Sequence, residues 1–348
     1  MTTQQHRFVL GERVSEPAVL PESVHLVVTS PPYPMVEMWD ASFSAQQPAV
    51  GKALSAVDGS GAFEAMHSIL DAVWADCHRA VVPGGLVCVN VGDATRKLGN
   101  DFQLFSNHAR TIQGLLSAGF QLLPDIVWRK PTNAPNKFMG SGMLPGGAYV
   151  TYEHEYIIIA RKGGRRVFRT AADKARRRRS AYFWEERNLW FSDVWQGLTG
   201  VRQAMKGTKR SRSGAFPFAL PARLIDMYSL QDDLVMDPFA GTGTTALAAA
   251  AAGRHSVSVE ADVSMQPVFE RTLSRVCAVS SGRTRQRLDA HRAFVAARVD
   301  SGKAVKHVSQ TYGFSVMSRQ EVEIALPVAT KISRLDQNRW KVDAKIGI

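Results

Sequence analysis

Short apolar runs rich in valine and isoleucine alternate with amphipathic stretches along most of this chain of 348 residues. Runs of this length and composition are typical of strands in a parallel sheet that is covered on both faces. Strands are predicted at 25–29, 85–92, 121–128, 155–160, 233–237 and 255–260, and helices at about 62–80, 104–118, 218–229 and 244–252. The alternation predicts a doubly wound α/β fold with a mostly parallel sheet.

Several stretches break this alternation. Residues 34–61 are rich in Gly, Ser, Gln and Ala, which predicts a mobile loop, and residues 129–149 are dense in Gly and Pro, which predicts a segment along the rim of a cleft. The aromatic patch "AYFWEERNLWF" (181–191) is expected to build a small core, because aromatic side chains at this density more often pack together than wedge into a ligand. "RQEVEIALPV" (319–328) alternates like an amphipathic strand.

Charge is distributed unevenly along the chain, whose formal net charge is +12. Residues 161–223 carry a net charge of +13 and residues 271–348 a net charge of +9, so the remainder carries −10. The rest of the chain is mildly acidic, so the two basic segments stand out. This distribution favours the interpretation that they bind a polyanion such as nucleic acid over the interpretation that they are merely solvated surface.

Neither cysteine usage nor the N-terminus indicates an extracellular or membrane protein. Cys77, Cys88 and Cys277 show no paired spacing, so neither a disulfide framework nor a zinc site is expected. No apolar run approaches the length that spans a membrane, and the N-terminus has no stretch typical of a signal peptide. The expected location is therefore cytoplasmic.

A glycine-rich turn joins a predicted strand to an alanine-rich helix in "DLVMDPFAGTGTTALAAAAAG" (233–253). Gly241 and Gly243 let the backbone turn sharply and approach a ligand, and Thr244 and Thr245 stand where the helix begins. Glu260 ends the next strand, where a carboxylate can accept hydrogen bonds from ribose hydroxyls. By itself "GTGTTA" also fits an NAD-dependent dehydrogenase or a plain strand–helix turn, and both alternatives stay open at this point.

A second unusual segment, "TSPPY" (29–33), follows an apolar strand directly. Parallel strands open their carboxyl ends on one edge of a sheet, so this segment and the glycine turn are expected to face one crevice. Pro31 and Pro32 present carbonyl oxygens without N–H donors, and Ser30 adds a hydroxyl. Such acceptors suit the exocyclic amino group of a nucleobase, with Tyr33 stacking on a base taken out of the duplex. The alternative is a proline-rich turn that merely ends a core strand.

The two segments together resemble the permuted (β-class) amino-methylating DNA methyltransferases, in which the "TSPPY" motif precedes "DPFAGTGTT". The resemblance covers roughly residues 8–275 and extends to "VVPGGLVCVNVGD", "GFQLLPDIVWRKPTNAP", "YEHEYIIIARKG" and "GAFPFALPARLIDMYS". It implies a Rossmann-like methyltransferase fold that uses S-adenosyl-L-methionine to methylate cytosine N4 or adenine N6 in double-stranded DNA. Serine at position 30 resembles the cytosine-N4 subgroup more than the adenine-N6 subgroup.

The resemblance also implies roles for individual residues. The catalytic motif corresponds to Ser30, Pro31, Pro32 and Tyr33. The residues expected to bind the cofactor are Glu12, Phe216, Pro217, Leu220, Asp237, Pro238, Phe239, Gly241, Gly243, Thr244, Thr245 and Glu260. No metal is expected, because the sulfonium group supplies the electrophile.

Target recognition in such proteins lies in a variable region, which corresponds here to residues 161–214. The resemblance implies that the catalytic and cofactor-binding domain is formed by the residues on either side, 1–160 and 215–270. Residues expected to contact DNA are Arg176, Arg177, Arg178, Arg179, Arg202, Lys206, Arg210 and Arg212. Residues 271–348 fall outside the resemblance and form a basic C-terminal extension of unknown role.

The sequence thus predicts a site-specific DNA methyltransferase that acts on cytosine N4 after base flipping, with adenine N6 as the alternative. A catalytically silent DNA-binding protein and an NAD-dependent oxidoreductase are the rivals outside this class. A cognate restriction endonuclease is a conceivable partner, and both a monomer and a homodimer remain open.

Overall fold

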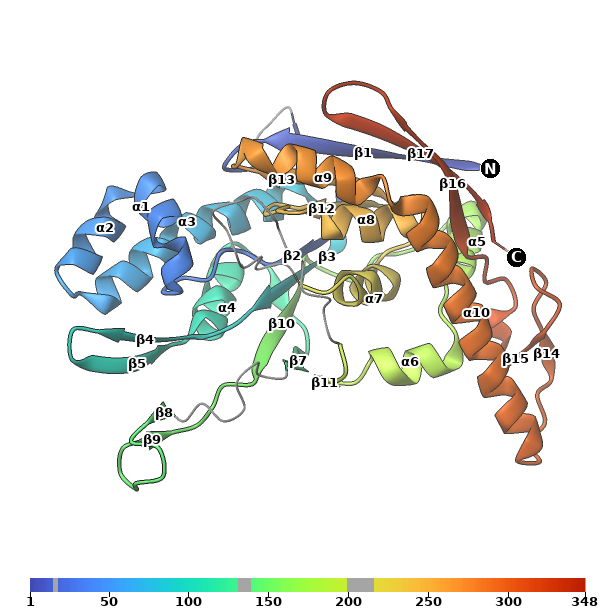
Figure 1. The fold of residues 1–348 in the computed structure, drawn as a ribbon. Helices are drawn as coiled ribbons and strands as arrows, with labels where there is room; N and C mark the ends of the chain where they lie inside the picture. Colours follow the sequence, from blue (N-terminus) through green and yellow to red (C-terminus); the bar gives the residue numbers. More distant parts are fainter. Residues whose placement is uncertain (15–17, 131–138, 199–215, 348) are drawn as a thin grey trace.

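An 11-stranded mixed sheet forms the centre of the computed structural model, which describes residues 1–14, 18–130, 139–198 and 216–347. The strand order is β11-β7-β10-β3-β2-β12-β13-β1-β17-β16, and β6 pairs with β10 (Figure 1). Its central strands are parallel: β3 (Val81–Val91), β2 (Val24–Thr29), β12 (Leu234–Asp237), β13 (His255–Glu260) and β1 (Thr2–Leu10). The predicted doubly wound α/β fold is confirmed.

Helices cover both faces of the sheet. One face carries α1 (Asp40–Gln46), α2 (Pro48–Ser55), α3 (Gly59–Ala80) and α4 (Asn107–Ser117), and the other carries α7 (Ala219–Tyr228) and α8 (Thr244–Ala251). Alternate residues of one strand enter opposite cores, since Val27 packs with the first group while Leu26 and Val28 pack with the second. Within the described residues, no helix is both long and apolar enough to cross a membrane.

One end of the sheet is antiparallel, which corrects the expectation that 121–128 and 155–160 belong to a parallel sheet. The first range divides into β6 (Gln121–Leu122) and β7 (Ile126–Arg129), and both pair antiparallel with β10 (His154–Arg161), which is itself antiparallel to β3. A parallel connection needs a crossover, usually a helix, and the described residues between β7 and β10 contain only the β8 (Met139–Gly140) and β9 (Ala148–Tyr149) hairpin. The short β11 (Val194–Trp195) then pairs with β7.

The C-terminal residues complete the other end of the sheet. β17 (Arg339–Ile346) pairs antiparallel with β1, and β16 (Pro327–Arg334) pairs with β17. The long α10 (Val276–Asp300) packs against α8 and β16, beside α9 (Gln266–Leu273). The range 271–348 is therefore built into the sheet that carries the central strands, and Trp340 is buried against Phe8 and Phe269.

Two local expectations are wrong. Residues 34–61 contain η1 (Glu37–Trp39), α1 and α2 rather than a mobile loop, because Phe43 and Val50 anchor the helices in the core. Residues 319–326 are not a strand, and only the last two residues of the expected range belong to one, β16. The segment begins with η3 (Arg319–Glu321), where the buried Glu321 accepts hydrogen bonds from the backbone N–H groups of Trp184 and Ser318. The other elements are α5 (Ala171–Arg179), α6 (Trp184–Trp190), η2 (Val263–Met265) and the hairpins β4–β5 (Ala94–Leu98, Asp101–Phe105) and β14–β15 (His307–Val308, Ser315–Val316).

Candidate active site

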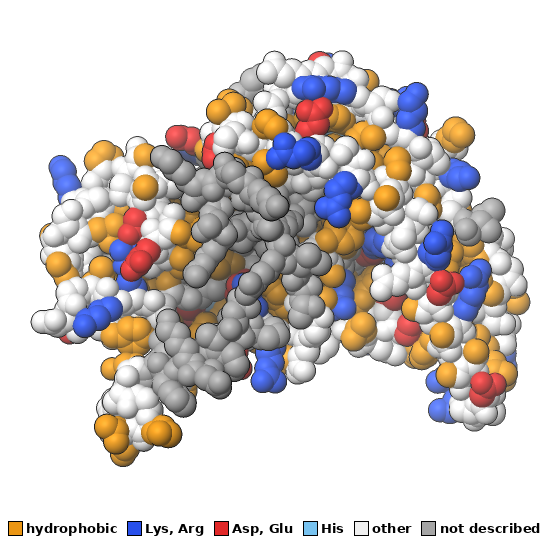
Figure 2. Space-filling model, viewed as in Figure 1, with side chains coloured by type: hydrophobic (Ala, Val, Ile, Leu, Met, Phe, Trp, Pro, Cys, Tyr) orange, Lys and Arg blue, Asp and Glu red, His pale blue; other side chains and the backbone are white. Residues whose placement is uncertain are grey.

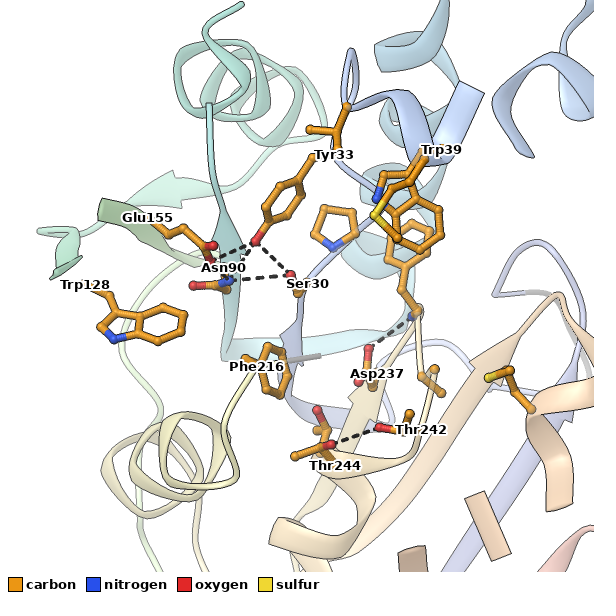
Figure 3. A pocket seen from close by; sticks show the side chains of 18 of the residues that line it. Ser30, Tyr33, Trp39, Asn90, Trp128, Glu155, Phe216, Asp237, Thr242 and Thr244 are labelled. Atoms are coloured by element: carbon orange, nitrogen blue, oxygen red, sulfur yellow. Dashed lines mark hydrogen bonds between the residues drawn. The ribbon is translucent and has the colours of Figure 1, made fainter. Parts of the chain in front are cut away.

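The two motif segments, about 200 residues apart in sequence, meet where β2 and β12 end side by side. The strands are parallel neighbours, so the residues that follow Thr29 and Asp237 open at one edge of the sheet. The Thr29 hydroxyl donates to Asp237 Oδ1 at 2.7 Å, and the Thr245 hydroxyl donates to the Val28 carbonyl at 3.3 Å. These bonds join the serine–proline segment to the glycine turn, and Figure 3 shows Ser30 of the first segment and Asp237, Thr242 and Thr244 of the second around one pocket.

A cavity of about 260 Å³ opens between the two segments. Of the residues expected in the site, those that line it are Ser30, Pro31, Tyr33, Phe216, Asp237, Phe239, Gly241, Thr244 and Thr245. Most of its accessible lining is apolar, with a few polar groups at defined positions, which is typical of sites for small organic ligands. The cavity therefore unites most of the predicted catalytic and cofactor-binding residues.

The other expected residues lie around this cavity rather than in its wall. Leu220 is fully buried in the core beneath it, whereas Glu12 is exposed just beyond β1. Pro32, Pro217 and Pro238 flank lining residues, and Gly243 begins α8. Glu260 lies behind the glycine turn and accepts a hydrogen bond from the Gly241 N–H at 2.8 Å.

The hydroxyl of Ser30 belongs to a hydrogen-bond network at one end of the cavity. The Tyr33 hydroxyl donates to Glu155 Oε2 at 3.0 Å, and Asn90 Nδ2 donates to Tyr33 Oη at 2.8 Å and to Glu155 Oε2 at 2.7 Å (Figure 3). The single proton of Tyr33 is therefore engaged with Glu155, so in the 3.1 Å contact between Ser30 Oγ and Tyr33 Oη the serine is the donor. Asn90 Nδ2 also approaches Ser30 Oγ, at 3.5 Å, so the serine oxygen keeps one lone pair fully open to accept a hydrogen bond from a ligand.

Burial keeps this network in the required protonation state. Burial, followed by the charge of Glu155, raises the pKa of Tyr33 well above its ordinary value, so the phenol keeps its proton. On the other side, Lys130 Nζ contacts Glu155 Oε1 at 2.6 Å and lies 5.4 Å from the centre of the Trp128 ring. Asn90 is 2% exposed, and its Oδ1 atom has no hydrogen-bond partner among the described residues.

The glycine turn has the conformation that its sequence demands. Gly241 and Gly243 have φ values of +50° and +81°, a region in which residues with a Cβ atom are strained. A Cβ atom on Gly243 would lie 2.5 Å from the Phe269 ring, whereas one on Gly241 would meet only the Phe239 carbonyl oxygen, at 4.0 Å. Gly241 is thus the point at which the backbone faces open space in the cavity.

Asp237 is the buried acid of the turn. Its Oδ1 accepts hydrogen bonds from the Thr29 hydroxyl and, at 3.1 Å, from the Phe239 N–H. Burial nevertheless raises its pKa to about 6, and the hydrogen bonds from Thr29, Thr245 and Phe239 only partly oppose that rise. Its role in this geometry is to hold the two segments together.

Among the described residues, the arginines predicted to contact DNA, Arg176 to Arg179, do not line this cavity. Arg176 and Arg178 in α5 form ion pairs with Asp233 and Glu323, at 3.6 Å and 2.7 Å. Asp233 precedes β12, whereas Asp237 is the last residue of that strand. The helix α5 therefore lies at the edge of the sheet opposite Asp237, and it also carries Arg177 and Arg179. The remaining predicted contacts, Arg202, Lys206, Arg210 and Arg212, lie outside the described residues.

Among the lining residues that sequence reasoning missed are those at the Ser30 end of the cavity: Asn90, Trp128, Lys130 and Glu155. Asn90 had a signal, because it is the only polar side chain in the apolar run "GLVCVNVG". Glu155 begins a strand that was read only as apolar. The aromatic patch behaves as expected for Phe183 and Trp190, which are buried, whereas Trp184 is 45% exposed.

Comparisons with known proteins agree with this geometry. Residues 24–270 match the model of the N6/N4 methyltransferase family, described as DNA methylase. The chain is 46% identical over 338 residues to the type II methyltransferase M.MthZI of Methanothermobacter thermautotrophicus, covering 97% of this chain and 94% of that protein. It is 42% identical over 282 residues to M.MjaI of Methanocaldococcus jannaschii, covering 78% of this chain and 92% of that protein.

A solved structure has the same architecture. TTHA0409 of Thermus thermophilus, a candidate DNA modification methylase, was crystallised in complex with S-adenosyl-L-methionine. It is 30% identical to this chain and superposes with a TM-score of 0.60, covering 78% of this chain and 94% of that one.

Proposed function

The chain belongs to the N6/N4 DNA methylase family, and we propose that within this family it methylates the exocyclic N4 of cytosine in duplex DNA. That it is a DNA methyltransferase follows from the family match and from the two type II methyltransferases that it resembles along most of its length. The observation that carries the proposal is the Ser30 hydroxyl, held as a hydrogen-bond acceptor at the edge of the cavity.

The cofactor is S-adenosyl-L-methionine, and the residues around the cavity fit it. Gly241 leaves space for a close approach to the backbone, Phe216 and Phe239 offer aromatic faces to a sulfonium cation, and Glu260 has carboxylate lone pairs beyond those used by Gly241 and Asp262. When bound there, it supplies an activated methyl group. The other residues proposed to hold it are Glu12, Pro217, Leu220, Asp237, Pro238, Gly243, Thr244 and Thr245.

The serine–proline segment is proposed to activate the nucleophile. The lone pair of an exocyclic amino group is delocalised into the base, which makes the nitrogen a poor nucleophile. Hydrogen bonds from its two N–H groups to Ser30 Oγ and to the Pro31 carbonyl favour a tetrahedral nitrogen and free that lone pair. A network that fixes the acceptor in advance stabilises the transition state at no cost in reorganisation.

Base flipping is proposed to bring the target base to this edge, where Pro32 and Tyr33 shape the pocket. A base inside the duplex cannot reach an enclosed acceptor, so it must leave the stack. The Tyr33 hydroxyl is engaged in the network, which holds the ring in a fixed position on which the base can stack. Arg202, Lys206, Arg210 and Arg212 are proposed to contact the duplex around the target, and Arg176 to Arg179 to bind phosphates elsewhere.

Cytosine is favoured over adenine because Ser30 resembles the cytosine-N4 subgroup of the family. The test is to incubate the protein with unmethylated DNA and isotopically labelled S-adenosyl-L-methionine, digest the DNA to nucleosides and identify the product by mass. We expect N4-methylcytosine. N6-methyladenine would overturn the choice of base, and cofactor binding without any labelled nucleoside would indicate a silent DNA-binding protein.

The two relatives named as type II methyltransferases suggest a place in restriction and modification. We propose that a partner endonuclease cleaves the site that this protein methylates. DNA methylated by the protein and then exposed to such an endonuclease is expected to resist cleavage.

A further inference from the structure

A second and larger cavity, of about 1360 Å³, opens at the opposite edge of the sheet. Its wall includes His25 near the start of β2, Leu86 in the first half of β3 and Leu230 just before β12, whereas the active-site cavity lies beyond the other ends of these strands. β2 spans 6 residues, so the sheet separates the two cavities by roughly 17 Å at 3.3 Å per residue. Residues that define this cavity, called here the basic groove, include Arg165, Arg177, Arg187, Arg319, Trp184 and Phe191.

The groove is strongly positive. Among the described residues, its wall holds seven arginines against two acidic residues, Asp226 and Glu321. Asp226 is paired with the buried arginines Arg283 and Arg287, so only Glu321, which accepts backbone hydrogen bonds, is left to offset one of the seven positive charges. The wall therefore carries a positive charge that the structure leaves uncompensated.

Four of these arginines, Arg165, Arg177, Arg187 and Arg319, are exposed and form no ion pair with any described residue. Arginines that serve only the fold would be expected to face carboxylates, as Arg166 does with Asp233 and Arg178 with Glu323. Free guanidinium groups gathered in a concave wall suit a ligand that carries several phosphates.

Aromatic rings are interleaved with the arginines. The Phe168 ring lies between two guanidinium groups, with Arg166 5.1 Å and Arg177 5.0 Å from its centre, which holds both groups in position. Trp184 and Phe191 are 45% and 38% exposed, although rings of this size are usually buried. Sites that bind single-stranded nucleic acid combine phosphate-binding side chains with exposed aromatic rings, on which the unstacked bases pack.

We propose that the basic groove is a second nucleic-acid-binding site that takes a single strand of DNA. The arginines would bind the phosphates, while Trp184 and Phe191 would stack with bases. A duplex keeps its base faces inside the stack and gains nothing from the rings, and an acidic peptide provides carboxylates without planar faces. The cavity exceeds the 300–1,000 Å³ usual for small-molecule sites, which favours a polymer over a mononucleotide. This binding is separate from methyl transfer and does not depend on it.

The test uses fluorescent oligo(dT) of roughly 12 nucleotides, within the range of site sizes of single-strand grooves. Thymine has no exocyclic amino group, so the probe offers nothing for methyl transfer. Binding is measured by fluorescence anisotropy with the full chain. The double variant Arg187→Glu/Arg319→Glu is expected to weaken binding at least 10-fold and to lower the salt slope by about 1.4, since each lost phosphate contact contributes about 0.7 on a single strand.

Trp184→Ala tests the stacking, because its backbone bond to Glu321 survives the change. It is expected to weaken binding at least 5-fold with no change in salt slope. The matched control is Arg275→Glu/Arg285→Glu, which makes the same change of charge on exposed residues of the α9–α10 region outside the groove. Figure 2 shows further basic side chains along α10, so the control also measures non-specific attraction to that surface. Cofactor affinity and the unfolding temperature of each variant report on folding.

Equal loss in the groove and control variants, or no loss in the groove variants, would overturn the proposal. The same variants are also measured with an oligo(dT)·oligo(dA) duplex. If their affinity for the duplex falls by the same factor as their affinity for oligo(dT), the groove binds the phosphates of duplex DNA and the single-strand assignment is wrong. If polyglutamate displaces the probe as well as unlabelled oligo(dT) does, the groove is an acidic-peptide site. None of these outcomes bears on the product of methylation, so the two proposals fail independently.

Discussion

Replacing Glu155 by glutamine tests the direction of the hydrogen bonds around Ser30. Lys130 contacts Oε1 at 2.6 Å, so the glutamine is expected to turn its amide oxygen toward Lys130 and its NH₂ group toward Tyr33. Tyr33 can then no longer donate in that direction, and its proton turns to Ser30 Oγ. The serine loses part of its capacity to accept the amino group of the base.

The size of the effect follows from the bonds that change. Tyr33 and Asn90 each donate to Glu155 Oε2, and a hydrogen bond to a charged group is stronger than a neutral one by about 1–1.5 kcal/mol. Two such bonds amount to about 2–3 kcal/mol, which corresponds to a fall in kcat of about 30- to 150-fold. Cofactor affinity should not change, because no group of the glycine turn is hydrogen-bonded to Glu155 within the described structure.

The assay is single-turnover methyl transfer from labelled S-adenosyl-L-methionine to DNA, which separates chemistry from product release, with cofactor affinity from calorimetry. Glu153→Gln is the matched control, because Glu153 is half-buried outside the cavity and approaches Arg129 at 3.7 Å. After Tyr33→Phe, the further change Glu155→Gln should keep only the share that passes through Asn90, about half of the free energy, since Tyr33 no longer transmits the rest. A Glu155→Gln enzyme within about 3-fold of the parent rate would refute the reasoning.

Three further changes test other parts of the molecule. Ser30→Ala should lower turnover by about 10²-fold or more in the same assay while sparing cofactor affinity; parallel loss of both would mean that the serine serves the cofactor. Burial raises the pKa of Asp237 to about 6, so ionising it costs stability as pH rises from about 4 to about 6. Asp237→Asn should therefore raise the free energy of unfolding by about 2 kcal/mol more at pH 8 than at pH 4.5. Urea denaturation at both pH values measures this, and an equal difference at both would contradict it. Asp226→Ala should destabilise the protein by about 3–5 kcal/mol, because Arg254, Arg283 and Arg287 would share a buried site without that carboxylate, whereas the exposed Asp289→Ala should change urea stability little.

The edge of the sheet explains why both motif segments can serve one reaction. β2 and β12 are adjacent and parallel, so a single register brings the Thr29 hydroxyl within hydrogen-bond distance of Asp237 and fixes the distance between the two segments. The same arrangement places the basic groove at the other end of these strands. Methyl transfer and the proposed single-strand binding thus use one rigid sheet from opposite edges.

Local patterns in the sequence were enough to predict the central parallel strands other than β1, the helices α3, α4, α7 and α8, and the two segments of the active site. These features depend on short-range patterns: alternating side chains that enter two cores, and glycines at the positions of positive φ in the turn after β12. Because parallel strands end at one edge, even the meeting of Ser30 with the glycine turn was predictable without coordinates.

The polar groups around Ser30, by contrast, depend on long-range packing that no local pattern shows. Asn90, Lys130 and Glu155 come from β3, from the end of β7 and from β10, and the antiparallel insertion of β10 beside β3 is what brings the carboxylate to Asn90. The tertiary structure likewise placed α5 at the far edge and β17 beside β1. Strand direction and order depend on long-range pairing and on the packing of distant segments, and a local pattern of apolar residues is the same whichever neighbour a strand finds.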